Sequence, residues 1–317
     1  MEVLQRTAEL ITGAKIPLLG LGTAAMNQNE NEIKAAVAAA LQVGYRHFDT
    51  ASAYRSEHAL GEALNAAFQS GLVKREDVFV TTKLWCSEHD DPVAAIKNSL
   101  KNLQLEYVDL YLIHWPIKLI KGNPLSSPKE NEFLPLDIKS TWQGMERCME
   151  MGFTKAIGLS NFSCTKIQDI LSYAKIPPAV DQVEMHPLWQ QNKLREFCSK
   201  HNIHVSGWSP LGAPNTPWGS NLVMDNPLIQ EIAQRHGKSK AQVLLRWGIE
   251  QGVSVVPKSY NRGRISENFE IFDWCLNPED HDKIGKIEQG KILRGEGFVN
   301  GTTSPYKSVQ ELWDGEI

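Results

Sequence analysis

The feature that most constrains the fold of this chain is a repeated alternation between short apolar runs and segments with helical periodicity. Polar turn residues separate each run from the helical segment that follows it. Strands that alternate with helices form parallel sheets, because each helix returns the chain to the starting end of the sheet. The runs, rich in apolar and β-branched residues, are Leu18–Leu21, Arg46–Phe48, Val78–Thr81, Val108–Ile113, Ala156–Leu159, Val180–Val183, His204–Gly207 and Val253–Val256.

These units follow one another without a composition break or a flexible linker, which predicts a single α/β domain over residues 1–317. A chain of this length suits a closed (β/α)8 TIM barrel, and this is the fold that we predict. An open, doubly wound parallel sheet has the same alternation. The pattern alone leaves that alternative open.

The helical segments carry start signals that support the alternation. Asp91 precedes Pro92, the order expected of an N-cap followed by proline at the first helical position. Ser239 and Gln242 have the spacing of a capping box. Between residues 33 and 41, apolar residues recur at the spacing of an amphipathic helix.

Three stretches fall outside the repeat. Residues 1–17 hold two short strand-like pieces around Thr12 and Gly13, which predicts an N-terminal β-hairpin that seals the barrel floor. Residues 116–138 are rich in proline, lysine and serine, and residues 290–317 form an irregular C-terminal tail. Long loops in a compact domain are usually functional or disordered, and barrels of this kind place function at the C-terminal face. We therefore expect long loops at that face.

The composition excludes several classes of partner. The net charge of −4 argues against a surface for nucleic acid or anionic membranes. The chain has neither a basic leader nor an apolar run of about 18 residues, as a membrane span requires. Its five cysteines are scattered, which is typical of reduced thiols in the cytoplasm. His201 and His204 straddle an expected helix–strand boundary, so we predict no metal site.

Polar residues mark the ends of the predicted strands. Asp49, Lys83 and His114 follow three consecutive runs, and Tyr54 lies in the loop after Asp49. Taken singly, the acid could cap a turn, the lysine could be solvated, the histidine could bond backbone and the tyrosine could be half-buried. Because strand ends of a barrel face one mouth, their joint placement favours a catalytic site. Further polar residues at strand ends are Ser160, Asn161, Gln182, Glu184, His186, Ser209, Lys258 and Ser259.

This set of residue types suits proton transfer to a carbonyl oxygen. A phenol with a pKa near 10 is a poor acid at neutral pH. A neighbouring lysine cation such as Lys83 is expected to lower the pKa of Tyr54, and Asp49 would keep that lysine charged and in place. A neutral imidazole at His114 could orient the carbonyl oxygen and donate to it as negative charge develops.

A hydride for that carbonyl must come from a separate donor. The segment from Gly20 to Gly22 lacks the third glycine of a Rossmann fingerprint, so that dinucleotide motif is absent. Lys258 and Arg264 flank the predicted start of the last barrel helix, where free N–H groups and the helix dipole favour phosphate. Two cations suit NADP, which carries an extra 2′-phosphate, better than NAD. A solvated helix start is the simpler alternative.

Seven segments of the chain together match the pattern of one known family. They are GYRHFDTASAY (44–54), TTKLW (81–85), VDLYLIHWP (108–116), AIGLSNF (156–162), PPAVDQVEMHP (177–187), GWSPLGA (207–213) and VPKSYNRGRISENFEIFDW (256–274). With these segments the sequence resembles the aldo-keto reductase family over essentially the whole chain. The resemblance implies a (β/α)8 barrel and NADPH-dependent reduction of carbonyl compounds. Within the family, the chain is most similar to the plant reductases, which include chalcone, codeinone and deoxymugineic acid reductases and general aldehyde reductases.

The resemblance also implies roles for individual residues. The implied catalytic tetrad is Asp49, Tyr54, Lys83 and His114, with Tyr54 as the general acid. The implied substrate pocket is formed by Trp85, His114 and Trp115, together with Trp218, residues 117–137 and the tail around Phe298. The implied contacts of NADPH/NADP+ are Gly22, Thr23, Asp49, Ser160, Asn161, Gln182, Trp208, Ser209, Leu211, Lys258, Ser259, Arg264, Glu267 and Asn268.

Two positions depart from the family pattern. Trp208 stands where the family often has a tyrosine stacked on the nicotinamide. Ala24 stands where many animal members have a pocket tryptophan, so the resemblance does not identify one substrate.

Our leading hypothesis is therefore an NADPH-dependent oxidoreductase that reduces an aldehyde or ketone to an alcohol. Two alternatives belong to other classes: an NADPH-binding barrel that acts through partners with little turnover, and a barrel isomerase or lyase in which Lys258 and Arg264 bind substrate phosphate. We expect a cytoplasmic monomer whose partner is a small carbonyl compound.

Overall fold

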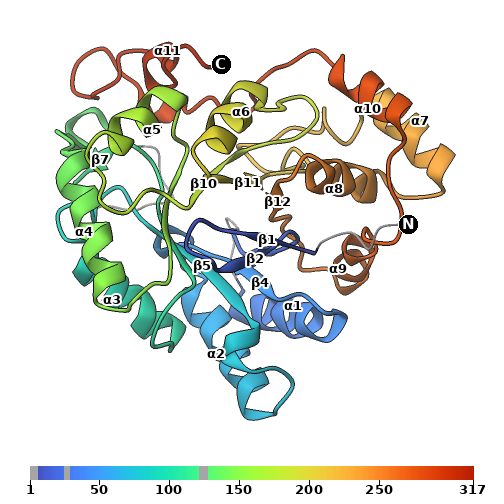
Figure 1. The fold of residues 1–317 in the computed structure, drawn as a ribbon, viewed down its shortest axis with the longest axis horizontal. Helices are drawn as coiled ribbons and strands as arrows, with labels where there is room; N and C mark the ends of the chain where they lie inside the picture. The colour runs from blue at the N-terminus through green and yellow to red at the C-terminus, as the bar shows by residue number, and fades with distance from the viewer. Residues whose placement is uncertain (1–5, 25–28, 121–127) are drawn as a thin grey trace.

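A computed structural model of the protein describes residues 6–24, 29–120 and 128–317. Parallel strands form one eight-stranded sheet, and helices surround it (Figure 1). Each strand overlaps or adjoins one of the apolar runs of the sequence. In chain order the strands are β3 (Leu21–Gly22), β4 (His47–Asp49), β5 (Phe79–Leu84), β6 (Leu110–Ile113), β9 (Ile157–Ser160), β10 (Val180–Glu184), β11 (His204–Trp208) and β12 (Ser254–Val255).

The two outer strands of this sheet meet, which makes it a barrel. β12 and the chain at β3 are joined by parallel bridges between Leu19 and Val255 and between Gly22 and Lys258. Backbone hydrogen bonds from Gly20 N to Val255 O, at 2.9 Å, and from Val255 N to Leu18 O, at 2.8 Å, complete the junction. The predicted (β/α)8 barrel is confirmed, and the open-sheet alternative is wrong.

The helices between strands begin at the predicted signals. Asp91 caps α3, accepting a hydrogen bond from Ala94 N at 2.9 Å, and Ser239 caps α8 in a capping box with Gln242. These caps satisfy N–H groups that a helix start leaves without partners. The barrel helices are α1 (Glu30–Val43), α2 (Glu57–Gln69), α3 (Pro92–Leu103), α4 (Ile138–Glu150), α5 (Cys164–Leu171), α6 (Asn192–Lys200), α8 (Lys240–Glu250) and α9 (Arg262–Phe269).

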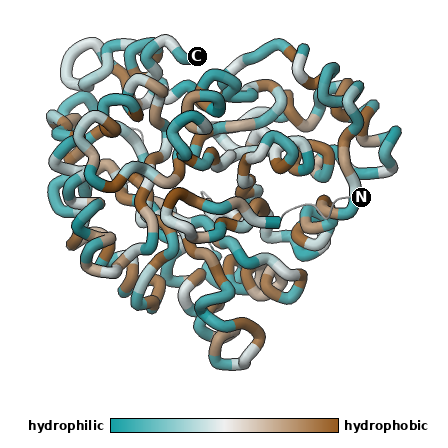
Figure 2. The backbone as a smooth tube through the Cα atoms, in the orientation of Figure 1, coloured by the Kyte–Doolittle hydropathy of each residue, from teal (hydrophilic) through white to brown (hydrophobic). Residues whose placement is uncertain are grey.

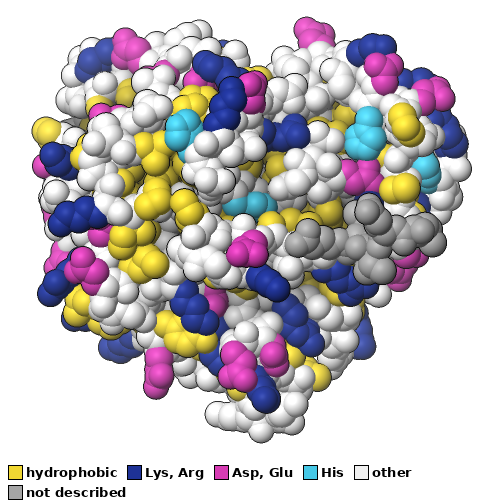
Figure 3. Space-filling model, in the orientation of Figure 1, with side chains coloured by type: hydrophobic (Ala, Val, Ile, Leu, Met, Phe, Trp, Pro, Cys, Tyr) yellow, Lys and Arg dark blue, Asp and Glu magenta, His cyan; other side chains and the backbone are white. Residues whose placement is uncertain are grey.

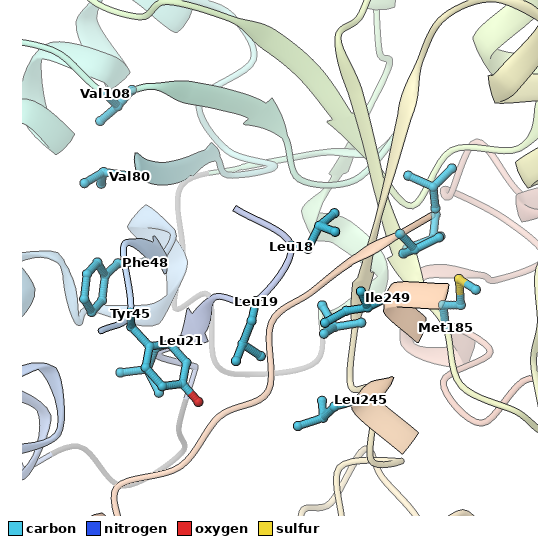
Figure 4. Packing of buried hydrophobic residues seen from close by; sticks show 14 of the residues in the cluster. Leu18, Leu19, Leu21, Tyr45, Phe48, Val80, Val108, Met185, Leu245 and Ile249 are labelled. Carbon is cyan, nitrogen blue, oxygen red and sulfur yellow. The ribbon is translucent and has the colours of Figure 1, made fainter. Parts of the chain in front are cut away.

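Apolar side chains fill the layer between the sheet and these helices. Figure 4 shows part of this cluster, in which Leu19 beside β3 and Leu245 and Ile249 of α8 lie among the buried residues. In Figure 2 hydrophilic residues are frequent along the outer helices, as an amphipathic pattern requires. On the face seen in Figure 3, positive and negative side chains are interspersed.

The N-terminal hairpin closes one end of the barrel. β1 (Thr7–Glu9) pairs antiparallel with β2 (Lys15–Pro17), and the hairpin crosses the middle of the view in Figure 1. Ile16 of β2 is fully buried in a separate cluster with Phe79 and Leu110, residues of the barrel strands. The prediction of a hairpin that seals the barrel floor is therefore confirmed.

The long segments at the other end contain more structure than the sequence predicts. The loop after β6 carries β7 (Lys118–Leu119) and β8 (Phe133–Leu134), which pair antiparallel, and a short 3-10 helix at Glu130–Glu132. Part of the predicted loop, residues 121–127, lies outside the described residues. Additional helices are α7 (Pro227–His236), α10 (Pro278–Gly285) and α11 (Val309–Leu312). Within the described residues, no helix is long and apolar enough to cross a membrane.

Candidate active site

The carboxyl ends of the barrel strands open into a cavity of about 1000 Å³. The sequence places the acid and the lysine just after their strands, and the structure places both within them. Asp49 is the last residue of β4, and Lys83 is the fifth residue of β5, where main-chain pairing fixes both backbones. His114 comes directly after β6. Regular strand geometry therefore positions this part of the site.

A buried ion pair lies at the base of the cavity. Lys83 is fully buried, and its Nζ lies 2.7 Å from Asp49 Oδ1 and 2.9 Å from the carbonyl oxygen of Thr50. The other carboxylate oxygen of Asp49 accepts a hydrogen bond of 2.7 Å from Gln182 Nε2. Although burial disfavours the charged amine, the charges of Asp49 and Tyr54 outweigh it and raise the pKa of Lys83 above its usual value. The lysine is a fixed cation at neutral pH.

A tight turn brings the phenol of Tyr54 to this cation. Residues Ser52–Tyr54 form a 3-10 helix, and Arg55 ends it in the left-handed region with φ 57°. The hydroxyl of Ser56 lies 2.9 Å from Thr50 Oγ1 and 2.8 Å from Thr23 Oγ1, which ties the turn to the ends of β4 and β3. Lys83 Nζ lies 4.9 Å from the centre of the Tyr54 ring.

The phenol faces the imidazole of His114. Tyr54 Oη lies 3.3 Å from His114 Nε2, and the two rings meet edge to face. Burial, with the charge of Lys83 adding to it, lowers the pKa of His114 well below its usual value. The imidazole is therefore neutral at neutral pH and can donate a hydrogen bond through only one of its ring nitrogens.

The sequence predicts that Lys83 lowers the pKa of Tyr54, and for the net shift this prediction is wrong. Burial of the half-buried phenol is the largest effect, and it raises the pKa of Tyr54 above its usual value. Lys83 acts in the predicted direction but does not overcome burial, and the charge of Asp49 opposes it. Tyr54 therefore carries its proton throughout the neutral range.

Amide and hydroxyl groups line the wall beside Asp49. Asn161 donates 2.9 Å to the carbonyl oxygen of His114 and 3.1 Å to Ser160 Oγ, and Ser160 Oγ donates 2.8 Å to the carbonyl oxygen of Gln182. The Trp208 indole donates to Asn161 Oδ1 at 3.1 Å, which orients the large ring at the end of β11. Asn161 itself has φ 64°, a conformation that asparagine tolerates well.

The far end of the cavity carries positive charge. Lys258 follows β12, and Arg264 lies in the first turn of α9, whose N-cap is Asn261. Neither side chain forms a salt bridge with any described residue. Burial, together with repulsion from Arg264, lowers the pKa of Lys258. Two mutually repelling cations at a helix N-terminus form a site suited to an anion.

Aromatic residues dominate the opposite end. Trp85 meets the His114 ring edge to face at 5.1 Å between centroids, and Trp115 lies 4.7 Å from Phe298. Leu293 and Trp218 line the same cavity. The cations that line the cavity within the described residues are Lys240 of α8, Arg264 of α9 and Lys258 in the segment between β12 and α9.

Most of the expected site residues share this one cavity. Lys83 lies behind it, in contact with Asp49, and Thr23 bonds Ser56 below the surface. Glu184 and His186, also noted at strand ends, do not line it. The expected residues that line it are Gly22, Asp49, Tyr54, Trp85, His114, Trp115, Ser160, Asn161, Gln182, Trp208, Ser209, Leu211, Trp218, Lys258, Ser259, Arg264, Glu267, Asn268 and Phe298.

The structure adds residues that the strand-end pattern does not reveal. Lys240 opens α8, Leu293 comes from the C-terminal tail, and Tyr260 bonds the carbonyl oxygen of Thr23 at 2.9 Å. Tyr260 lies inside the basic segment after the last strand, so its closeness to Lys258 in the sequence could have predicted that it lines the cavity. Nothing in the local sequence distinguishes Lys240 or Leu293 from ordinary surface and core residues.

Comparisons with known proteins agree with this geometry. A family model described as "Aldo/keto reductase family" matches residues 18–289. Aldo-keto reductase family 4 member C11 of Arabidopsis thaliana is 49% identical over 311 residues, covering 98% of both chains. NADPH-dependent codeinone reductase 1-4 of Papaver somniferum is 49% identical over 309 residues, covering 96% of both chains.

A solved structure gives the same result for the fold. The crystal structure of a Bombyx mori aldo-keto reductase in complex with NADP superimposes with a TM-score of 0.83 at 35% identity. The match covers 90% of this chain and 94% of that one.

Proposed function

Because the chain belongs to the aldo/keto reductase family, it reduces carbonyl compounds with NADPH, and we propose that Tyr54 is the general acid of this reaction. The observation that carries the proposal is the position of the Tyr54 phenol, 3.3 Å from a neutral imidazole and beside a buried cation. A proton donor must lie within hydrogen-bonding reach of the group that it protonates. Tyr54 lines the cavity, so a substrate bound there can come within that reach.

The chain's own groups account for the proton transfer. The raised pKa of Tyr54 keeps the phenol protonated before the reaction, so the proton is available at neutral pH. As the proton leaves Oη, negative charge develops on a ring whose centre lies 4.9 Å from Lys83 Nζ. Asp49 keeps that ammonium charged and fixed. A fixed cation in a buried site stabilises developing charge without reorganisation.

His114 acts as a hydrogen-bond donor to the substrate oxygen. With the imidazole neutral, a proton on Nε2 points to the place where Tyr54 Oη also lies. A carbonyl oxygen bound between these two groups would be oriented for protonation by the phenol. Asn161 bonds the backbone carbonyl of His114 and so holds this histidine in place.

The residues present fit NADPH in two places. Ser160, Asn161 and Gln182 offer amide and hydroxyl groups beside the tetrad, as a carboxamide needs. Lys258 and Arg264 lack salt-bridge partners within the described residues, and free cations of this kind suit phosphate. When bound, NADPH supplies the hydride.

The charge distribution in the cavity supports a substrate without a carboxylate. The wall around the tetrad is aromatic and apolar, with Trp85, Trp115 and Phe298 as its main surfaces. A carboxylate there would lose its hydration without gaining an ionic partner among the described residues. We infer that the preferred substrates are uncharged aldehydes and ketones with an apolar or aromatic group.

We also propose that residues 1–317 act as one barrel domain and that the protein is a cytoplasmic monomer. The eight strands form one sheet, and all five cysteines are free thiols, four of them buried. Reduced thiols are typical of that compartment. Light scattering during size-exclusion chromatography tests the oligomeric state, and a dimer mass would overturn that part of the proposal.

The function is tested by NADPH oxidation, followed by absorbance, with a panel of matched carbonyl pairs. Benzaldehyde and 4-carboxybenzaldehyde differ only in a carboxylate, so their kcat/KM ratio isolates the charge effect. We expect turnover of both, with a preference of about tenfold or more for benzaldehyde. Equal or reversed preference would refute the substrate class, and turnover of no carbonyl compound would refute the reductase.

A further inference from the structure

A buried ionic cluster lies outside the cavity, between β10 and the C-terminal tail. Its acid is Glu184, the last residue of β10, and its cation is Lys291, which follows α10 by six residues. Both side chains are 1% exposed. Charged residues this deeply buried are uncommon in a soluble domain, and none of the proposed proton-transfer steps uses them.

Glu184 binds the tail through its backbone. Its carboxylate accepts hydrogen bonds of 3.0 Å from Ile292 N and 3.0 Å from Leu293 N, as well as one of 3.1 Å between Oε1 and His186 Nε2. Although burial alone would favour the neutral acid, the histidine bond and the charge of Lys291 lower the pKa of Glu184. The ionised carboxylate therefore holds the chain just where Leu293 enters the cavity wall.

Lys291 connects the same acid to the end of the chain. Its Nζ lies 3.7 Å from Glu184 Oε2, an ion pair too long for a hydrogen bond, and 3.7 Å from the centre of the Trp313 ring. It has no hydrogen-bond partner within the described residues. Burial lowers the pKa of Lys291 to about 8, and burial also raises the pKa of Asp181 well above its usual value. Burial therefore disfavours a charge on Asp181, and Glu184 is the acid that lies within ion-pair distance of this lysine.

Trp313 links Lys291 to the cavity wall. Its indole Nε1 donates 2.8 Å to the carbonyl oxygen of Arg294, and its ring meets Trp115 edge to face. Trp115 in turn lies against Phe298, and both line the cavity. The backbone at Gly295 lies close to Leu312, and only glycine fits there. A Cβ at this position would lie 2.7 Å from Leu312 Cδ2, and the φ of Gly295 is +79°. The packing leaves this wall little freedom.

A second attachment fixes the other side of the tail. Lys166 of α5 donates to the carbonyl oxygen of Leu312 at 2.9 Å and to Asp314 at 2.6 Å, and Ser163 also bonds Asp314. Figure 1 shows α11 beside α5. The tail is thus held at both ends, and the buried pair is the end closer to the cavity.

We propose that Glu184 and Lys291 are positioning residues that fix the substrate end of the cavity by holding Leu293 directly and Phe298 through Trp313 and Trp115. The proposal rests on the proposed function of the cavity and adds two residues that touch neither the substrate nor the cofactor. The ion pair sets the shape of the aromatic wall, and therefore the affinity for substrates large enough to reach it. Small carbonyl compounds that contact only the tetrad do not sense it.

The test compares Lys291→Met, which removes the charge but keeps the length, with Lys291→Arg, which keeps the charge. Lys286→Met is the matched control, because Lys286 is an exposed lysine of the same segment, paired with Asp282 on the surface. Each variant is assayed with propanal and with 2-naphthaldehyde, and the Kd of NADPH is measured by fluorescence. Hydrogen exchange of residues 291–299 gives a readout that does not depend on turnover.

We expect Lys291→Met to raise the KM for 2-naphthaldehyde by about tenfold, the value of one good aromatic contact. The KM for propanal and the Kd of NADPH should change by less than about twofold, and exchange in 291–299 should become faster. Lys291→Arg should keep the KM for 2-naphthaldehyde close to its wild-type value. An unchanged KM for 2-naphthaldehyde, or an equal loss for both substrates and NADPH, would overturn the proposal.

A second variant covers the case in which Lys291→Met does not fold. Trp313→Leu removes the same cation–ring contact from the tail side. It must likewise raise the KM for 2-naphthaldehyde and leave the KM for propanal nearly unchanged. If it leaves the two KM values in their original ratio, the positioning role is refuted. If the wild-type protein reduces no carbonyl compound at all, the proposed function is refuted instead, and the hydrogen-exchange result still decides the anchoring role.

Discussion

Replacement of Lys83 by methionine removes the one cation of the Asp49 pair while keeping the length of the side chain. Lys83 is fully buried and Asp49 nearly so, at 0% and 3% exposure. The substitution removes the contact of 2.7 Å to Asp49 and that of 2.9 Å to Thr50 O. It leaves a buried carboxylate with Gln182 as a remaining side-chain donor, at 2.7 Å.

The expected loss of stability follows from that unpaired charge. Removal of one partner of a buried ion pair costs about 3–5 kcal/mol, because the remaining charge is not compensated. Gln182 still donates to Oδ2 of Asp49, so we expect the lower half of this range. Asp49→Asn in the Lys83→Met background removes the stranded charge and should restore part of the unfolding free energy.

The expected loss of activity has a separate cause. Lys83 lowers the pKa of Tyr54, while burial and Asp49 raise it. Without Lys83 the pKa of Tyr54 rises further, the phenolate formed in the transition state is less stable, and kcat falls. General acid–base catalysis is worth about 10² to 10⁴ in rate, and loss of its supporting cation should cost about 10². In the direction of alcohol oxidation, where Tyr54 accepts the proton, the pH at which the rate rises should move upward.

The assay combines urea unfolding with steady-state NADPH oxidation at several pH values. Lys101→Met on α3 is the control, because that lysine is exposed and does not line the cavity. The reasoning is refuted if Lys83→Met keeps kcat within about threefold of the wild type while folded. It is also refuted if Asp49→Asn in the same chain lowers stability further.

Three more predictions test other parts of the account. Arg264→Ala should raise the Kd of NADPH by about 10- to 100-fold, the value of charge-assisted hydrogen bonds, and change the Kd of NADH by less than about twofold; equal changes would contradict a 2′-phosphate contact. Burial lowers the pKa of His89 to about 4, so the folded state loses stability as pH falls from about 6.5 toward 4. The stability of His89→Gln relative to wild type should therefore improve by roughly 3 kcal/mol between pH 7 and pH 4 in urea unfolding, and a constant difference would contradict a neutral buried imidazole. Ile16→Ala should cost about 2–4 kcal/mol of unfolding free energy, because Ile16 is fully buried under the barrel, and a change in kcat above about twofold would show that the hairpin does more than seal the floor.

The barrel and the polar residues at its strand ends could be predicted because both follow from local patterns. Asp49, Lys83 and His114 each end or follow an apolar run, and parallel strands necessarily bring such ends to one face. The first strand is shorter than predicted: β3 begins at Leu21, and Leu19 pairs with Val255 through a single bridge instead of a continuous ladder. Periodicity detects the apolar run, not the extent of its pairing.

The contacts of the tail could not be predicted in the same way. Glu184 and Leu293 are 109 residues apart in the sequence, and nothing near either residue specifies the other. The pKa of Tyr54 also required coordinates, because burial and Lys83 shift it in opposite directions and only the degree of burial decides the sign. In residues 116–138 the composition indicated a loop, whereas β7 and β8 depend on pairing with each other.

The most direct test of the central claim is the single-turnover rate of Tyr54→Phe with NADPH bound in advance, measured with benzaldehyde by stopped flow. The substitution removes only the phenolic oxygen and keeps the ring that meets His114 edge to face. With Tyr54 as the general acid, the rate falls by about 10² to 10⁴ while the Kd of NADPH stays within about twofold of the wild type. A rate within about threefold of the wild type would contradict the account.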